Sequence, residues 1–267
     1  MIRITKFRCN AFEEISYLVW TGKACVLIDP GFDCGEEFTS LYGTLKQNGI
    51  QPSAILLTHA HPDHVYGAHR LAEEFGCRVY VNYGEKVTLT ALHGLCLNLG
   101  HADVEDFSGR TVWINDSDRI VVTGDGVQTV SADGPASGGK AGEPAAGKAG
   151  QEEGVLEFKA LLTPGHSAGG VCYLCREPEP GSEGRDVSED GWKVLFSGDT
   201  LFAGCIGRSD LPGGDYDTLM HSIFSKLLCL DGDIDVLPGH GRPTTISEER
   251  MKNPFLQPFN EPYEDGE

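Results

Sequence analysis

Short apolar runs bounded by polar or glycine-containing turns recur along the chain, and each run predicts a β-strand. The runs at residues 2–7, 15–20 and 24–28 lie close together, so the chain is predicted to open as a β-meander. Later runs predict strands at residues 54–57, 78–81, 119–122, 156–162, 170–174, 193–196 and 234–237.

Apolar residues spaced three or four apart predict helices among these strands. The first helix is marked by Phe38, Leu41, Tyr42 and Leu45, and Gly49 follows as its C-cap. Further helices are predicted at residues 65–75, 216–228 and 246–251. In α/β chains of this kind, ligand-binding groups collect on loops at strand ends, so we expect the chemistry to lie there.

Two segments lack an apolar period. Residues 131–153 are rich in glycine, alanine and lysine, and residues 177–191 are acidic and contain prolines. Neither segment can bury enough apolar surface to offset the entropy of ordering it. The strands on both sides of each segment still need partners, so we predict a single domain over residues 1–267 with flexible insertions at these two places.

Composition and charge narrow the class of protein. The chain has 267 residues, 40% of them hydrophobic, which suffices for a substantial core. No apolar run is long enough to cross a bilayer and no export signal opens the chain, so we expect a cytoplasmic protein. The formal net charge of -19 argues against nucleic acid and against an anionic membrane as partners, because both repel carboxylates. The oligomeric state stays open.

The chain has nine cysteines, and most sit singly inside apolar runs, where a reduced thiol behaves as a small hydrophobe. Disulfides are therefore not expected. Cys172 and Cys175 form a CxxC pair, which is compatible with a redox or metal site. However, the pair lies in a predicted strand whose alternation points the two side chains to opposite faces, so core packing is the favoured interpretation.

The densest chemical signal is LLTHAHPDHVYG at residues 56–67, at the end of a predicted strand. His59 and His61 lie two apart on a turn, so both rings can converge on one ion, while Asp63 and His64 reach its other side. Imidazole and carboxylate ligands without a thiolate suit zinc, iron or manganese. We favour a catalytic metal site with an open coordination position over a chance group of surface histidines.

Three other strand ends carry residues of the same types. His166, Asp199 and His240 each follow an apolar run, and a glycine directly precedes each of them. Glycine allows close approach of the backbone or unusual dihedral angles. Each of these turns is common by itself, but their repetition predicts that the three residues are further ligands.

Together the motifs THAHPDH, PGH, GDT and PGH, in that order, resemble the metallo-β-lactamase superfamily. Residues 197–215 (SGDTLFAGCIGRSDLPGGD) and 236–256 (VLPGHGRPTTISEERMKNPFL) are similar to its glyoxalase II-like branch, the hydroxyacylglutathione hydrolases. The resemblance implies a four-layer αββα sandwich with the site at one edge, between the two sheets. Full-length members of that branch carry an additional helical region after the last metal histidine. Only residues 241–267 follow His240, so we expect this region to be lacking.

The resemblance also implies a ligand set. The first metal would be held by His59, His61 and His166, the second by Asp63, His64 and His240, and Asp199 would bridge the two. A hydroxide bridging two divalent ions is a strong nucleophile near neutral pH. We expect zinc, with iron or manganese as alternatives, and we expect Asp63 and Asp199 to be the catalytic residues.

A thiolate leaves without protonation, which fits a thioester better than an amide. We therefore expect a small-molecule thioester or a related ester as substrate, with S-lactoylglutathione as the leading candidate. Arg208, Arg242 and Lys252 are candidate substrate contacts, although an ion pair that orients the loop is the favoured role for Arg208. Two alternatives stay open: a mononuclear iron persulfide dioxygenase, and a non-enzymatic, metal-stabilised sensor of acyl-thiol metabolites.

Overall fold

The computed structural model describes residues 1–101, 104, 107, 109–131, 154–178 and 191–257. The strands are β1 (Arg3–Cys9), β2 (Glu14–Thr21), β3 (Ala24–Ile28), β4 (Ala54–Leu56), β5 (Arg78–Asn82), β6 (Thr111–Ile114), β7 (Arg119–Thr123), β8 (Val127–Val130), β9 (Val155–Leu162), β10 (Val171–Arg176), β11 (Val194–Gly198), β12 (Leu201–Phe202), β13 (Cys205–Ile206), β14 (Asp235–Pro238) and β15 (Thr244–Thr245). The helices are α1 (Gly35–Asn48), α2 (Pro62–Val65), α3 (Ala68–Phe75), the 3-10 turn η1 (Tyr83–Glu85), α4 (Lys86–Asn98), α5 (Tyr216–Ser222), the π-helical turn η2 (Ile223–Leu227) and α6 (Ile246–Lys252).

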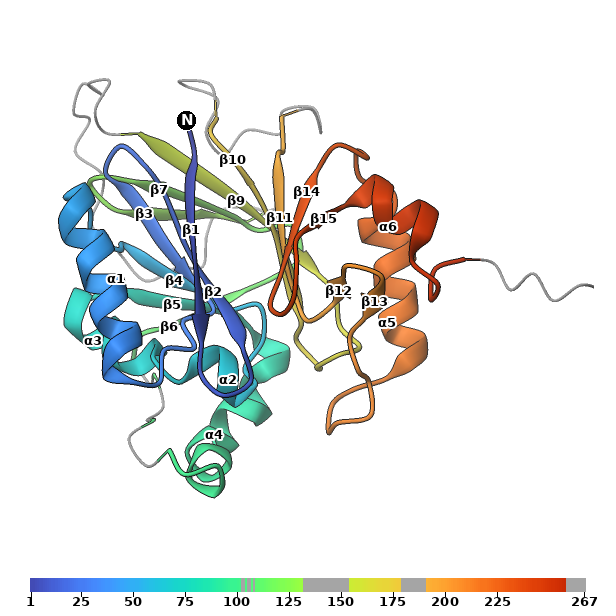
Figure 1. Cartoon of the computed structure of the whole chain (residues 1–267), viewed down its shortest axis with the longest axis horizontal. Helices are drawn as coiled ribbons and strands as arrows, with labels where there is room; N and C mark the ends of the chain where they lie inside the picture. Colours follow the sequence, from blue (N-terminus) through green and yellow to red (C-terminus); the bar gives the residue numbers. More distant parts are fainter. Residues whose placement is uncertain (102–103, 105–106, 108, 132–153, 179–190, 258–267) are drawn as a thin grey trace, which may run out of the picture.

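These elements form two large sheets that pack face to face (Figure 1). The first sheet has the order β1-β2-β3-β4-β5-β6, antiparallel over β1 to β3 and parallel from β3 to β6. The second has the order β15-β14-β11-β10-β9-β7-β8. Helices α1 and α3 cover the outer face of the first sheet, and α5 and α6 cover the outer face of the second (Figure 1). The predicted αββα order of four layers is confirmed.

Strand alternation explains why both sheets are apolar on both faces. Along β3, Cys25 and Leu27 point into the core beneath the α1 and α3 helices, whereas Val26 and Ile28 point into the core between the sheets. A third core lies between the second sheet and the helices α5 and α6. A strand buried on both faces reads as a continuous apolar run, which is the pattern that this sequence shows.

The CxxC pair follows the same alternation. Cys172 belongs to the core beneath α5, and Cys175 belongs to the core between the two sheets. All nine cysteines are free thiols. Core packing, the favoured interpretation of this pair, is confirmed.

The predicted helix at residues 65–75 is wrong at its start. The chain forms the short α2 first, breaks at Tyr66 and Gly67, and then begins α3 at Ala68. A Cβ atom on Gly67 would lie 3.0 Å from the carbonyl oxygen of Pro30, and the Gly67 N–H bonds this same oxygen at 2.9 Å. The close contact with the loop after β3 therefore interrupts the helix, an effect of packing that the local sequence does not reveal.

Besides the two-residue strands β12, β13 and β15 and the short turn η1, three longer elements were not predicted: α4, β6 and β8. The sequence of α4, KVTLTALHGLCLN, is apolar almost all round, so no helical period stands out, although only Leu89, Leu92 and Cys96 are buried. β6 and β8 are four-residue strands, each at the edge of one sheet. Of their eight residues, only Ile114 is buried. Short, half-exposed edge strands give little apolar signal.

The two predicted insertions, at residues 131–153 and 177–191, fall almost wholly outside the described residues. Among the helices that the structure does describe, none combines the length and the apolar character needed to cross a membrane.

Candidate metal centre

The predicted ligands come from loops at the carboxyl ends of strands in both sheets. The loop after β4 and the short α2 carry His59, His61, Asp63 and His64, whereas His166, Asp199 and His240 follow β9, β11 and β14. Two backbone hydrogen bonds join the sheets beside these loops: Val171 N–H donates to Thr58 O at 2.8 Å, and Ile15 N–H donates to Gly239 O at 2.7 Å. Residues that lie up to about two thirds of the chain apart are thereby brought to one edge.

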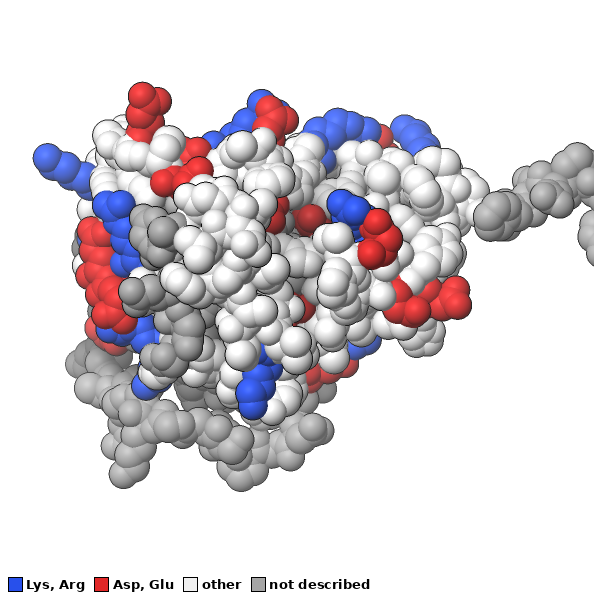
Figure 2. Space-filling model, turned by 90° about the horizontal axis from the view of Figure 1, so that it is seen from below, with Lys and Arg blue, Asp and Glu red and all other residues white. Residues whose placement is uncertain are grey.

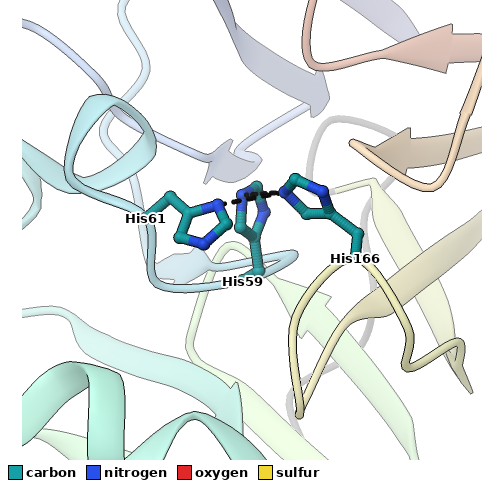
Figure 3. A group of neighbouring side chains, drawn as sticks. All are labelled: His59, His61 and His166. Atoms are coloured by element: carbon teal, nitrogen blue, oxygen red, sulfur yellow. Dashed lines mark hydrogen bonds between the residues drawn. The ribbon is translucent and has the colours of Figure 1, made fainter. Parts of the chain in front are cut away.

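Three ring nitrogens converge in the first group of ligands, which consists of His59, His61 and His166 (Figure 3). His166 Nε2 lies 3.0 Å from His61 Nδ1 and 3.3 Å from His59 Nε2. Nitrogens that share one tetrahedral zinc at 2.0–2.1 Å are about 3.3 Å apart. The spacing therefore fits three imidazoles around one cation.

Burial keeps His59 and His61 in the neutral form. Burial, together with the neighbouring imidazoles, lowers the pKa of His61 to about 4 and the pKa of His59 well below its usual value. A neutral imidazole has a lone pair to offer, and a metal ligand must be unprotonated. The first group is therefore ready to bind a cation near neutral pH.

The second group consists of Asp63, His64 and His240. Asp63 Oδ2 lies 3.3 Å from His240 Nε2 and 3.7 Å from His64 Nε2. Burial alone would raise the pKa of Asp63, but His64 and His240 hold it below its usual range. Burial likewise opposes charge on His64, but the carboxylates of Asp199 and Asp63 raise its pKa well above the usual value. This group therefore contains ionised carboxylates beside protonated imidazoles.

Asp199 lies between the two groups. Its Oδ2 is 3.7 Å from His166 Nε2 and 3.6 Å from His240 Nε2, while its Oδ1 is 3.5 Å from His64 Nε2. Asp199 Oδ1 and His64 Nε2 are fully buried and face each other at 3.5 Å, but neither atom makes a hydrogen bond to a described residue. Buried polar atoms without a hydrogen bond are costly and rare, so this pair, which lies between the two groups of ligand-type side chains, indicates a missing cation. The donor set of imidazoles and carboxylates fits zinc, iron or manganese.

Each of three rings is oriented by a partner on its other nitrogen. His166 Nδ1–H donates to the carbonyl oxygen of Arg208 at 2.8 Å, and His64 Nδ1–H donates to Asp29 Oδ2 at 3.1 Å. His59 Nδ1 lies 3.0 Å from Thr58 Oγ1, whose hydroxyl donates to Asp29. Such partners fix the tautomer, which leaves the remaining nitrogen of each ring for the metal.

Sequence reasoning missed two buried acidic residues beside His64. Asp29 follows β3, the neighbour of β4, and its backbone has φ 45°, which is unusual for a residue other than glycine. Glu14 is fully buried, and Ser16 Oγ donates to it at 2.9 Å. Asp29 could have been found by the rule that singled out the predicted ligands, since it also stands at the carboxyl end of a parallel strand.

Gly239 shows why glycine precedes His240. A Cβ atom at this position would lie 2.5 Å from Asp199 Oδ1 and 2.6 Å from His64 Cε1. Any side chain here would fill the space between the two ligands. The glycine predicted to allow close approach therefore borders the centre itself.

The candidate substrate contacts have partners of their own. The exposed Arg208 side chain forms a bidentate ion pair with Asp210 at 2.8 Å, as favoured from the sequence. Arg242 and Lys252 are exposed and both lie near Glu248, at 3.4 and 3.8 Å. A role in substrate binding stays a prediction for all three residues.

The NPFL segment, by contrast, has a structural role. Asn253 is fully buried and donates to Cys205 O at 3.0 Å and to Glu249 Oε2 at 2.7 Å. Glu249 also accepts the N–H of Gly204 at 2.8 Å. Both contacts hold the β12–β13 hairpin, whose Phe202 ring lies 6.4 Å from the ring of His240.

Comparisons with known proteins agree with this geometry. The model of the metallo-beta-lactamase superfamily matches residues 14–179. The chain is 31% identical to the hydroxyacylglutathione hydrolase GloC of Haemophilus influenzae, over 92% of this chain and 94% of that protein. It is also 31% identical to the probable metallo-hydrolase YqgX of Bacillus subtilis, over 92% of this chain and 93% of that protein.

Two solved structures are similar along the whole chain. The BLEG-1 B3 metallo-beta-lactamase is 28% identical with a TM-score of 0.68, covering 96% of this chain and 100% of that one. TTHA1623, in a di-iron-bound form, is 29% identical with a TM-score of 0.66, covering 94% of this chain and 100% of that one.

Proposed function

Because this chain belongs to the metallo-beta-lactamase superfamily, as its motifs predicted, we propose that it is a hydrolase that holds two divalent cations and cleaves a thioester or a related small ester. The observation that carries the proposal is the buried pair Asp199 Oδ1 and His64 Nε2, which makes no hydrogen bond to a described residue and lies between two groups of side chains of metal-ligand type. The di-iron form of TTHA1623 supports a centre for two ions.

The residues divide between the two cations as follows. The first is held by His59, His61 and His166, the second by Asp63, His64 and His240, and Asp199 contacts both. When bound, such a pair of ions lowers the pKa of coordinated water from 15.7 towards about 7 and polarises a substrate carbonyl. We propose zinc as the metal, with iron and manganese as the alternatives that the same ligands accept.

Asp63 and Asp199 are the proposed catalytic residues. Burial opposes charge on both, but the surrounding histidines lower the pKa of each carboxyl group, so both are ionised near neutral pH. As carboxylates they hold the cations and can accept a hydrogen bond from the attacking water. The nearby thiol of Cys172 is not a nucleophile, because burial raises its pKa to about 11.

The choice of a thioester follows from the leaving group. A thiolate, with a pKa of about 8.5 in its free acid, departs without a proton donor. S-lactoylglutathione is the leading substrate, a choice supported by the name of the relative GloC. The described part of the face that carries the strand ends is mostly uncharged, with no broad field of lysine and arginine (Figure 2). This supports a small molecule as the partner, not nucleic acid or an anionic membrane.

The proposal is tested by metal analysis followed by kinetics. Protein purified without added metal should contain two metal ions per chain, and the metal-loaded protein should release glutathione from S-lactoylglutathione much faster than free metal does. Rates no better than free metal would eliminate this substrate while leaving other esters open.

The same measurements separate the alternatives. One iron per chain with oxygen uptake would support a persulfide dioxygenase. Substitution of Asp199 by alanine should abolish hydrolysis in an enzyme, whereas a sensor would retain its ability to bind an acyl-thiol ligand.

A further inference from the structure

Glu85 is a buried carboxylate that joins two loops of the metal centre. It ends the η1 turn after β5 and has no exposed surface. Its Oε2 accepts the N–H of Ala60 at 3.2 Å, and its Oε1 accepts the N–H of Gly169 at 2.8 Å. Ala60 stands between His59 and His61, and Gly169 lies in the turn that begins at His166. One carboxylate therefore contacts the backbone of both loops that carry the first group of ligands.

The surrounding backbone is built for this contact. A Cβ atom on Gly84 would lie 2.6 Å from the carbonyl oxygen of Ala168, and a Cβ atom on Gly169 would lie 2.5 Å from the Glu85 nitrogen. Two glycines thus allow the η1 turn and the loop after His166 to touch backbone to backbone. The contact accounts for Gly169 in the segment PGHSAGG, which the ligand assignment leaves unexplained.

A carboxylate is the side chain that suits two N–H donors arriving from opposite loops. Its two oxygens are both acceptors, and charge-assisted hydrogen bonds are about twice as strong as neutral ones. Glutamine would present one acceptor and one N–H₂ group, which would oppose one of the two backbone donors. Alanine would leave both backbone N–H groups buried without a partner.

The two loops have a second connection that does not involve Glu85. Val171 N–H donates to Thr58 O at 2.8 Å, which ties the same strands together one step further from the rings. The two sheets should therefore stay joined when Glu85 is changed, while the spacing of His59, His61 and His166 relaxes.

We propose that Glu85 is a positioning residue: by bridging Ala60 and Gly169 it sets the distances among His59, His61 and His166 and thereby the affinity of the first metal site, without touching the metal. The inference rests on the proposed function, because it requires that these histidines bind a cation.

The test measures metal affinity directly. Metal-free protein is titrated with zinc in competition with a chelating dye, which gives a dissociation constant for each of the two ions. Glu85→Gln should weaken one ion by about 10- to 100-fold, the range found when partners of metal ligands are removed. Glu85→Ala should weaken it more, so the conservative variant should show partial rescue. The other ion should bind within about twofold of the wild-type constant.

Two further variants show which of the two ions Glu85 affects and whether the effect is specific to Glu85. His166→Ala removes a ligand of the first group, so the ion that it loses should be the ion that Glu85→Gln weakens. Glu249→Gln is a matched control, because Glu249 is also a buried carboxylate that accepts a backbone N–H, at 2.8 Å from Gly204, but it contacts no loop of the first group. It should lower the melting temperature to a similar extent while leaving the first ion bound as tightly as in the wild type.

Unchanged constants in a folded Glu85→Gln protein would overturn the inference, and so would equal weakening of the first ion by Glu249→Gln, since that would indicate general loosening. A wild-type chain that binds no ion would overturn it together with the proposed function. A wild-type chain that binds two ions but cleaves no thioester would refute the proposed substrate alone, because no substrate enters this measurement.

Discussion

The two groups of metal ligands differ in charge although they share Asp199. The first group contains only imidazoles, and burial lowers the pKa of His61 to about 4. The second contains the carboxylate of Asp63, and although burial disfavours charge on His64, the neighbouring carboxylates raise its pKa well above the usual value. His59 and His61 in one group are thus neutral near neutral pH, whereas His64 in the other carries a proton where a cation would sit.

The supports of the two groups differ as well. In the first group, the Arg208 carbonyl oxygen bonds the His166 ring, and the Glu85 side chain bonds the backbone N–H groups beside the histidines. A buried side chain, Asp29, orients His64 in the second. Substitutions of side chains should therefore reach the two ions by different routes, which makes the groups separable by experiment.

The largest loss of activity is expected on substitution of Asp199, which lies between the two groups. Asp199→Ala removes a carboxylate that lies within 4 Å of ring nitrogens in both groups. Hydrolysis should fall by more than about 100-fold, the upper end for residues that only orient a ligand. Steady-state kinetics on the thioester measures this. If the variant kept a tenth or more of the activity, Asp199 would not serve both ions.

Removal of one histidine ring from either group should abolish binding of the ion in that group alone. His166→Ala and His240→Ala each leave two ligands in the affected group, and both should lower the metal content from two ions to one. Elemental analysis of each purified variant gives the count, with the wild type prepared in parallel as the reference. Loss of both ions in both variants would show that the groups do not bind independently.

Asp29→Asn should weaken binding of the second ion by about 10- to 100-fold and binding of the first ion less, because Asp29 bonds His64 directly but reaches His59 only through Thr58. Asparagine has the same shape as aspartate and tolerates the positive φ of 45° at this position, so the backbone should be retained. However, it presents one acceptor oxygen in place of two, and His64 Nδ1 and the Thr58 donors compete for it. Zinc competition measures both constants. If only the binding of the first ion were weakened, Asp29 would support the first group and not the second.

Proton release should distinguish the groups without any substitution. The lowered pKa values of His59 and His61, the latter about 4, keep both rings neutral at neutral pH, so the first ion displaces no proton from them. The raised pKa of His64 means that one proton must leave its ring when the second ion binds. Affinity for the second ion should therefore fall more steeply with falling pH than affinity for the first. Calorimetry in buffers of different ionisation enthalpy counts the protons, and equal release for both ions would contradict the difference between the groups.

The smallest effect is expected for Arg208→Ala. Its side chain pairs with Asp210 in solvent, where water and salt screen the charges and an ion pair contributes little to stability. The contact with His166 belongs to the carbonyl oxygen of Arg208, which alanine keeps. Metal affinity should stay within about twofold of the wild-type value. A selective rise in KM would instead support the predicted substrate contact, and a lost first ion would show that the side chain holds the loop.

Much of the fold follows from the sequence because its strands are buried on both faces. Such strands appear as apolar runs wherever they lie, and the motifs at their ends predict the candidate ligands by residue type alone. The elements that were missed lack this signal: α4 has no polar face to reveal its period, and β6 and β8 are short edge strands.

Residues that support the centre were harder to predict. Nothing local separates Glu14 and Glu85 from the other acidic residues of this chain, whereas Asp29 at least stands at the end of a parallel strand. Their importance depends on burial and on contacts with loops far away in the sequence. Only the assembled structure shows that His64, Ala60 and Gly169 are their neighbours.

The central claim is that both groups bind a cation and share Asp199. Anomalous diffraction from crystals grown with zinc tests this most directly. We predict two peaks, one close to the ring nitrogens of His59, His61 and His166, the other close to Asp63, His64 and His240, with Asp199 in contact with both. A single peak, or peaks away from Asp199, would contradict the account.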